Sequence, residues 1–398
     1  MKDLSFSGTA AKVLLCLILL PAVLSCEKFP AVDEAEEPSS ISLEELAYIF
    51  SRLPLEQEHL DEVHAAVSSS VENGYDEEYT MADLFNSPGA GVGSAATKAP
   101  SGRWSRPLRT LLEDYLEHSF ATRAAEVLPP PGSASEFISA LAGSDAQIYW
   151  PYSEDWDGRS MPVITFDPGG EMTANIGYEM HPDGSVKEIV VTERTAMERP
   201  VWVMNRNDDS AYQTIEMLRR QDPEWGMGGS IVVRKDTKSG NDTKTLILRD
   251  FEAERNYDSW FAGGSEFWVK AGSLEDFYAS TEAEMRLYSP SITDFLVVVK
   301  RSQIGQRIPF NAILVSDWTE QLTALAFMIT EDDGGTMTTW KCNAKVMIKS
   351  KSYGFDIEIP FNSRDDIVWR GQLSRSYFEK NNNVEGHFGD VYLTFGII

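Results

Sequence analysis

The chain has 398 residues and a formal net charge of −27 at pH 7. A charge this negative argues against nucleic acid as a partner and against electrostatic adsorption to anionic lipid. The 10 Trp and 19 Phe residues exceed what a disordered chain carries, so we expect most of the chain to fold, and its length is sufficient for two domains.

An apolar run from Val13 to Leu24 is typical of a secretory signal peptide. The run is shorter than the roughly 20 residues that a membrane-spanning helix needs. It ends in Val23-Leu24-Ser25-Cys26, which resembles the lipobox of bacterial lipoproteins. The resemblance implies cleavage before Cys26, a diacylglycerol on the Cys26 sulfur and acylation of the new amino terminus. The alternative is an ordinary signal peptide cut nearby, with Cys26 incidental.

The residues after Cys26 indicate where a lipidated chain would be held. Glu27, in place of Asp, resembles an outer-membrane sorting signal, and the acidic stretch Asp33–Glu37 resembles the tethers of surface-exposed lipoproteins in the Bacteroidota. We therefore predict that residues 1–26 are a lipoprotein signal peptide. We predict that a lipid anchor holds the chain at the outer membrane. The cell surface is one of the two sides of that membrane on which it could lie.

Residues 27–105 are predicted to form an acidic tether, a helical hairpin and a linker. Ser42 is followed three residues later by Glu45, the spacing of a capping box. Apolar residues at helical spacing then predict helices over residues 41–66, interrupted at Pro54. The stretch from Ser87 to Ser105 is rich in Gly, Ala and Ser, which indicates a flexible linker.

Residues 106–240 are predicted to form a helix followed by a β-rich region. Apolar residues at helical spacing predict a helix over residues 107–126, and Pro182-Asp183-Gly184-Ser185 has the composition of a hairpin turn. A short helix is expected at Tyr212–Arg220. The predicted strands are Gln147–Trp150, Pro162–Phe166, Asn175–Met180, Lys187–Thr192, Pro200–Met204 and Ser230–Arg234.

Residues 241–398 are predicted to form an antiparallel β-sandwich, because short alternating strands follow one another with turn residues between them. The predicted strands are Leu246–Arg249, Glu266–Ala271, Glu284–Tyr288, Phe295–Lys300, Pro309–Val315, Leu322–Thr330, Lys341–Lys349, Gly354–Pro360 and Asp390–Gly396. The predicted fold is therefore mainly β, with an N-terminal helical segment, a smaller α+β middle region and a C-terminal sandwich.

The cysteines and histidines indicate no catalytic site. Cys16 lies in the predicted signal peptide and Cys26 at the lipidation position, so Cys342 has no partner for an intramolecular disulfide. Its alternating surroundings predict a buried strand residue rather than a nucleophile. The five histidines form no His-Glu-x-x-His motif, and no Gly-x-Ser-x-Gly motif is present.

The C-terminal half resembles a known calcium-binding sandwich. Residues 246–271 include Asp258-Ser-Trp-Phe-Ala-Gly-Gly-Ser-Glu266-Phe-Trp-Val-Lys270, which resembles the opening of the C-two domain, a family that binds calcium and sometimes phospholipid. Residues 327–333 resemble the strand and Asp-x-Asp loop of that family, and residues 365–367 resemble the acidic residue that closes the loop. Carried over by position, the implied calcium ligands are Asp258, Glu266, Glu331, Asp333 and Asp366.

This resemblance has clear departures. Glutamate replaces aspartate at two of the five positions, and two predicted strands separate Asp333 from Asp366 where the family has a few residues. The alternative is that these loops are merely rich in acids and hold no metal.

The whole chain also resembles uncharacterised outer-membrane lipoproteins of Bacteroidota type, in residues 149–156 and 200–207. The favoured function is a non-enzymatic, lipid-anchored binding or interaction protein, facing the surface or the periplasm. Its expected partners are the membrane, through the anchor, and an unknown surface ligand or protein, with no nucleic acid. Acidic loops gathered at one pole of a sandwich would support this interpretation.

The second function considered is a secreted hydrolase that acts on glycan through paired carboxylates. Asp155 and Asp157 are its candidate acids, and Trp150, Trp156 and Trp225 are candidates for stacking on sugars. A pocket that joins the two aspartates to a further carboxylate would support it.

Overall fold

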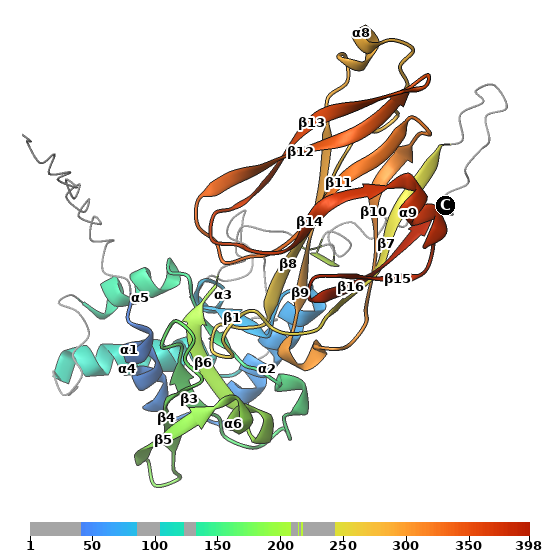
Figure 1. The fold of residues 1–398 in the computed structure, drawn as a ribbon. Helices are drawn as coiled ribbons and strands as arrows, with labels where there is room; N and C mark the ends of the chain where they lie inside the picture. The colour runs from blue at the N-terminus through green and yellow to red at the C-terminus, as the bar shows by residue number, and fades with distance from the viewer. Residues whose placement is uncertain (1–40, 86–103, 123–132, 208–213, 215, 218–242) are drawn as a thin grey trace, which may run out of the picture. The chain divides into compact units, whose positions relative to one another are not determined.

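The structure is a computed structural model that describes residues 41–85, 104–122, 133–207, 214, 216–217 and 243–398 (Figure 1). Cys26 with the predicted signal peptide, the tether before residue 41, most of the linker, most of the helix expected at Tyr212–Arg220 and the strand expected at Ser230–Arg234 lie outside these residues. Among the described helices, none combines the length and the apolarity needed to cross a membrane. As predicted, the fold is mainly β with several antiparallel sheets and an N-terminal helical segment.

The N-terminal part is built on one six-stranded sheet, with strand order β1-β2-β6-β3-β4-β5. All neighbours are antiparallel except β3 and β6. The turn predicted at Pro182–Ser185 joins β4 to β5, and the His181 amide donates to the Ser185 carbonyl at 2.9 Å. The strands are β1 (Glu78–Thr80), β2 (Ala146–Tyr149), β3 (Val163–Phe166), β4 (Ala174–Met180), β5 (Val186–Thr192) and β6 (Val201–Arg206).

Most described helices of this part pack on one face of this sheet. Ser42 caps the first of them by accepting a hydrogen bond from the Glu45 amide at 3.4 Å, and a break that contains Pro54 separates it from the second, as predicted. The helices of this part are α1 (Leu43–Ser51), α2 (Gln57–Glu72), α3 (Met81–Phe85), α4 (Leu108–Thr122), α5 (Ala134–Ala142) and α6 (Glu193–Glu198), with a 3₁₀ turn at Ser153–Asp155.

Strand alternation gives the sheet two buried faces. Trp202 on β6 and Ile164 on β3 lie in a core with residues of α1 to α5, such as Phe50. Their neighbours Val203 and Val163 lie in a separate cluster. Because successive residues of a strand point to opposite faces, the second cluster covers the face turned away from that helical core. The helical core contains residues 41–85 as well as residues after 105, so it crosses the domain boundary predicted at residue 105.

The C-terminal part has two sheets that enclose one core. Phe251 of the first sheet lies 5.1 Å from Phe267 of the second, between ring centroids, and Phe395 of the first lies 5.6 Å from Phe327 of the second. The first sheet has the order β10-β7-β16-β15. The second has the order β13-β12-β11-β8-β9, and β14 pairs with β11. This arrangement is a β-sandwich, as predicted.

Most of the predicted strands of the sandwich are longer than the sequence pattern indicated. The strands are β7 (Lys244–Ala253), β8 (Ser265–Ser273), β9 (Ser291–Val299), β10 (Ile308–Trp318), β11 (Leu322–Glu331), β12 (Met337–Ile348), β13 (Lys351–Asn362), β14 (Asp366–Ser374), β15 (Glu385–Phe388) and β16 (Val391–Ile397). Two short helices, α8 (Glu282–Met285) and α9 (Arg375–Lys380), and a 3₁₀ turn at Arg301–Gln303 complete it.

Two local predictions need correction. The segment predicted as a strand at Glu284–Tyr288 begins in helix α8, because Thr281 caps that helix by accepting a hydrogen bond from the Glu284 amide. Cys342 lies on β12 as predicted, but it is half-buried rather than buried. Burial still raises the pKa of its thiol to about 11, which keeps the thiol protonated and unreactive at neutral pH.

Candidate metal site

Three of the predicted calcium ligands meet at one end of the sandwich. Asp258 lies between β7 and β8, Glu331 is the last residue of β11, and Asp333 follows two residues later. One carboxylate oxygen from each residue lies within 4.8 Å of the other two. Calcium–oxygen distances of about 2.3–2.6 Å place two ligands on opposite sides of an ion about 5 Å apart. The three carboxylates are therefore close enough to share one ion.

Strand geometry explains why Glu331 points into this group. Phe327, Ile329 and Glu331 are alternate residues of β11 and share one face, and the first two belong to the sandwich core. Their partners on β8 are Ala271, Val269 and Phe267, which belong to the same core. Glu331 thus continues the inward-facing row of apolar residues and places a carboxylate at the end of the core.

The carboxylate of Glu331 is buried without a hydrogen-bond partner. Glu331 is 0% exposed, and neither Oε1 nor Oε2 of its side chain has a hydrogen-bond partner among the described residues. The same holds for Oδ2 of Asp258 within the described part of the chain. An ionised carboxylate is strongly disfavoured in such a place unless a proton or a cation neutralises it.

The acidity of the group reflects this environment. Burial, and then the neighbouring carboxylates of Asp258, Asp333 and Asp366, raise the pKa of Glu331 to about 11. Burial is also the main reason that the pKa of Asp258 rises to about 6, while contact with the protonated Glu331 carboxyl and then the Arg301 guanidinium act in the opposite direction. Burial and the charge of Asp366 raise the pKa of Asp333. Without a cation, the folded chain therefore holds protons in this group.

The remaining two predicted ligands lie differently. Asp366 begins β14 and pairs with Glu331 in the antiparallel register, so it borders the group from the exposed side. Glu266 is buried on β8, one residue before Phe267, the partner of Glu331. Because neighbouring residues of a strand point to opposite faces, Glu266 faces away from Glu331. Three of the five predicted acids are therefore close enough to share one ion, Asp366 borders them, and Glu266 points away.

Asp332, in the same loop, has a carboxylate whose oxygens accept hydrogen bonds, in contrast to Glu331. It accepts hydrogen bonds from Trp268 Nε1 at 2.9 Å, the Gly334 amide at 2.9 Å and Asn362 Nδ2 at 3.0 Å. Burial opposes its ionisation, but these hydrogen bonds lower its pKa. Asp332 therefore shapes the loop, while Glu331 and Asp333 on either side of it point toward Asp258.

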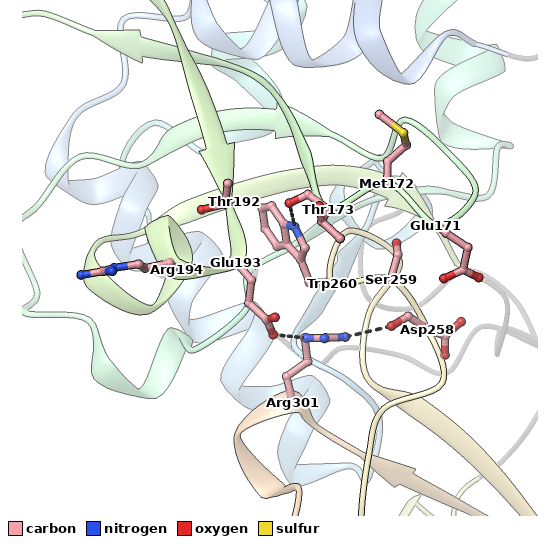
Figure 2. A pocket seen from close by; sticks show the side chains of 10 residues that line it. All are labelled: Glu171, Met172, Thr173, Thr192, Glu193, Arg194, Asp258, Ser259, Trp260 and Arg301. Atoms are coloured by element: carbon pink, nitrogen blue, oxygen red, sulfur yellow. Dashed lines mark hydrogen bonds and ion pairs between the residues drawn. The ribbon is translucent and has the colours of Figure 1, made fainter.

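A polar pocket adjoins the acidic group (Figure 2). Its volume is about 400 Å³, and Asp258 belongs both to its lining and to the three-carboxylate group. The lining comes from the N-terminal part and from the sandwich, and comprises Glu171, Met172, Thr173, Thr192, Glu193, Arg194, Asp258, Ser259, Trp260 and Arg301. Sequence reasoning missed Glu193 and Arg301, which form an ion pair although 108 positions separate them. No spacing pattern connects residues so far apart.

The acids proposed for a hydrolase do not reach this pocket. Asp157 accepts hydrogen bonds from the Arg159 amide at 2.9 Å and from the Ser160 amide at 2.7 Å, so its carboxylate closes a turn. Asp155 is exposed, and neither aspartate lines the pocket.

Two of the three tryptophans proposed to stack on sugars pack in or against the helical core. Trp150 is buried in the helical core, and Trp156 is half-buried against it, with ring centroids 5.2 Å apart. Trp225 lies outside the described residues. Trp150 therefore has no face open to a sugar, and the Trp156 ring is partly covered by Trp150.

Comparison of the chain with protein-family models, curated proteins and solved structures finds no match.

Proposed function

We propose that this chain is a calcium-binding, non-enzymatic lipoprotein, anchored to the outer membrane through Cys26, whose sandwich holds the ion between Asp258, Glu331 and Asp333. The anchor rests on the sequence around Cys26 alone. The metal rests on one observation, the buried carboxylate of Glu331, which has no hydrogen-bond partner among the described residues and lies beside two further carboxylates.

The donor set favours calcium over other common ions. All the donors are carboxylate oxygens, which suit calcium and magnesium, whereas the group contains no histidine or cysteine that would suit zinc. Two ligands lie on loops and one at a strand end, and calcium tolerates such variable geometry better than magnesium does. When bound, calcium would neutralise the clustered charge and link the β7–β8 loop to the end of β11.

The adjoining pocket supports a binding role. It offers the guanidinium group of Arg301 and carboxylates from Glu171 and Glu193, beside the hydroxyl groups of its threonines and serine, whereas Arg194 points away toward Glu198 (Figure 2). With Met172 and Trp260 also in the lining, the pocket suits a small molecule that has both polar and apolar groups. The turn-closing role of Asp157 gives no support to the glycan hydrolase.

Calorimetric titration with calcium chloride tests the metal directly. The sample is the chain from Glu27 to Ile398, which retains every described residue and is first stripped with a chelator. We expect one binding site and a rise in the melting temperature on addition of calcium, because a ligand at about 100 times its dissociation constant stabilises the fold by about 2.7 kcal/mol. Magnesium at the same concentration should have a smaller effect.

Two variants make the test specific. Glu331→Gln removes a proposed ligand, and Glu358→Gln removes an equal charge from an exposed position on β13. We expect calcium to stabilise the Glu358→Gln variant as it does the unchanged chain, and to have little effect on Glu331→Gln. Equal calcium responses in the two variants would show that the ion binds elsewhere.

A further inference from the structure

The loop that carries Asp258 is also the segment through which the sandwich meets the N-terminal sheet. We call residues 254–264, between β7 and β8, the docking loop. Within it, Trp260 is 3% exposed and Phe261 is 0% exposed. Both pack on the face of the N-terminal sheet turned away from its helical core, in a cluster with Tyr149, Val163, Val191, Ala196, Val201 and Val203.

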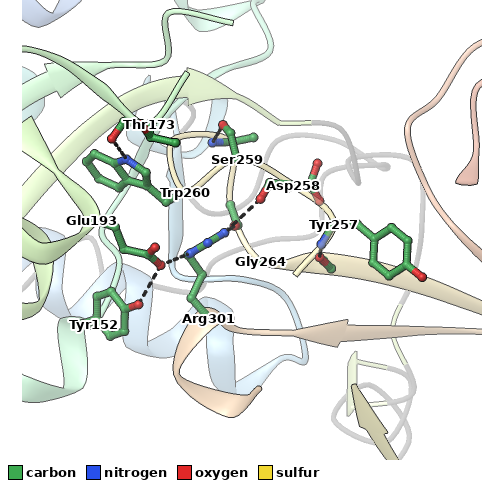
Figure 3. A network of polar contacts seen from close by, with 12 residues as sticks. Tyr152, Thr173, Glu193, Tyr257, Asp258, Ser259, Trp260, Gly264 and Arg301 are labelled. Carbon is green, nitrogen blue, oxygen red and sulfur yellow. Dashed lines mark hydrogen bonds and ion pairs between the residues drawn. The ribbon is translucent and has the colours of Figure 1, made fainter. Parts of the chain in front are cut away.

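Hydrogen bonds fix this loop to the N-terminal part at several points. Trp260 Nε1 donates to the Thr173 carbonyl at 3.1 Å (Figure 3). Asn205 Nδ2, on β6, donates to the Phe261 carbonyl at 3.2 Å and also to the Ala262 carbonyl. The Gly264 amide donates to Oδ2 of the buried Asp76 at 2.8 Å. The main chain of the loop is therefore held by both strand and loop residues of the N-terminal part.

Glycine is required where the loop returns to the sandwich. A Cβ atom at Gly264 would lie 2.6 Å from the Val299 carbonyl oxygen, closer than side-chain carbons approach other atoms. The backbone of the loop therefore passes directly against Val299, the last residue of β9.

Arg301 links the docking loop to helix α6 of the N-terminal part. Its Nη1 donates to the carbonyl of Asp258 at 3.2 Å and to the carbonyl of Gly263 at 3.1 Å. Its Nε donates to Oε1 of Glu193, on α6, at 2.5 Å, and the same oxygen accepts from the Tyr152 hydroxyl at 3.0 Å. Arg301 thus sets the main-chain position of Asp258 from one side while it is tied to the N-terminal part on the other (Figure 3).

We infer that calcium binding and the seating of the docking loop on the N-terminal sheet are thermodynamically coupled, with Arg301 as the positioning residue for Asp258. This inference rests on the proposed calcium site. Without the ion, no cation links the carboxyl groups of Asp258 and Glu331, so the loop is tied less firmly to the end of β11. With the ion, both carboxylates are drawn to one cation, and the loop that bears Trp260 and Phe261 is fixed with them.

Coupling of this kind is reciprocal. If calcium binds the seated loop more tightly than the unseated loop, a substitution that favours the unseated loop must weaken calcium binding, at most by the ratio of the two affinities. Asn205→Ala removes the hydrogen bonds to the Phe261 and Ala262 carbonyls without touching any proposed ligand. We expect it to raise the calcium dissociation constant at least about fivefold, the lower end of typical coupling.

Arg301→Gln tests the same coupling with a substitution in the sandwich. Loss of a positive charge near the site should tighten calcium binding if charge alone mattered, because the site becomes more negative. Loss of a positioning residue should instead weaken binding. We expect weaker binding, while Arg370→Gln, which removes the charge of an exposed arginine on β14, should bind calcium as the unchanged chain does.

The experiment combines calorimetry with hydrogen–deuterium exchange on the chain from Glu27 to Ile398, with calcium chloride as the probe. We expect calcium to slow amide exchange in residues 254–264 of the unchanged chain. If calcium binds but leaves that exchange unchanged, or if both Asn205→Ala and Arg301→Gln bind calcium with unaltered affinity, the coupling is wrong and the calcium site stands. If the unchanged chain binds no calcium, the proposed function and the coupling both fall. Far-UV circular dichroism verifies that each variant is folded.

Discussion

Glu331 on β11 lies directly opposite Asp366 on β14 in the antiparallel register of the two strands. Like charges in this position destabilise a strand pair. Here the inner member of the pair is fully buried and also lies beside Asp258 and Asp333. The metal-free sandwich therefore ends in a group of acids that disfavours its own ionisation.

This relationship predicts that Glu331→Gln stabilises the chain when calcium is absent. Glutamine has nearly the same shape, and it does not need to bind a proton to remain neutral in a buried site. We expect the free energy of unfolding, measured by urea denaturation in the presence of a chelator, to rise by about 1–3 kcal/mol. The same substitution should remove the gain that calcium gives. A variant that is less stable than the unchanged chain in chelator would show that burying the Glu331 carboxyl group does not destabilise the metal-free fold.

The raised pKa values predict an unusual pH dependence for the metal-free chain. An acid whose pKa is higher in the folded state holds more protons there, so stability is greatest below the unfolded pKa, about 4, and falls as the pH rises. The contribution of Asp258 should be lost up to about pH 6, and that of Glu331 should continue to decline through neutral pH. Melting temperatures in chelator between about pH 5 and about pH 8 measure this decline.

Two comparisons isolate the acids of this site from other titrating groups. Glu331→Gln should show a shallower decline than the unchanged chain, because one of the carboxyl groups with a raised pKa is gone. Saturating calcium should also flatten the decline, because the ion keeps the carboxylates ionised in the folded state. Identical pH profiles for the variant and the unchanged chain would assign the dependence to other groups.

Much of the fold follows from local sequence patterns. Alternating apolar residues predicted β12 and β13, and proline and turn residues predicted the break before α2 and the hairpin between β4 and β5. The pattern failed where local signals compete. At residues 284–288 the threonine cap at Thr281 favoured a helical turn over a strand. β14 was missed because its alternation is weak, with polar residues on both faces.

The candidate site was predictable only in part. Spacing alone places Glu331 and Asp333 on one side of the chain, since they are two residues apart in an extended segment. The proximity of Asp258 depended on a family resemblance, and the error at Glu266 arose because that resemblance does not report which face of β8 a residue occupies. Arg301 and Glu193 could not be found from sequence, because only the docking of the loop on the N-terminal sheet brings them together.

Lipidation at Cys26 remains a prediction from the sequence. Expression of the full chain in a Gram-negative host supplied with an alkyne-labelled palmitate should give a labelled protein. Cys26→Ala should remove the label, because the thiol that accepts the diacylglycerol is gone, whereas Cys342→Ala should leave it unchanged, since Cys342 is half-buried on β12. Equal labelling of the Cys26→Ala variant would disprove the anchor.

The shared helical core predicts that the first helix contributes to the stability of the whole N-terminal part. Phe50 on α1 is 0% exposed and lies in the same core as Trp202 and Ile164. Phe50→Ala should leave a cavity there and lower the free energy of unfolding by about 3–5 kcal/mol, as large truncations in well-packed cores do. Leu287→Ala is the matched control, because Leu287 is 82% exposed, and it should change stability by less than about 0.5 kcal/mol. Chemical denaturation followed by far-UV circular dichroism measures both. If Phe50→Ala proves as mild as its control, then the segment before residue 105 is not part of this core, and the boundary predicted from the sequence would describe the chain better than the shared packing does.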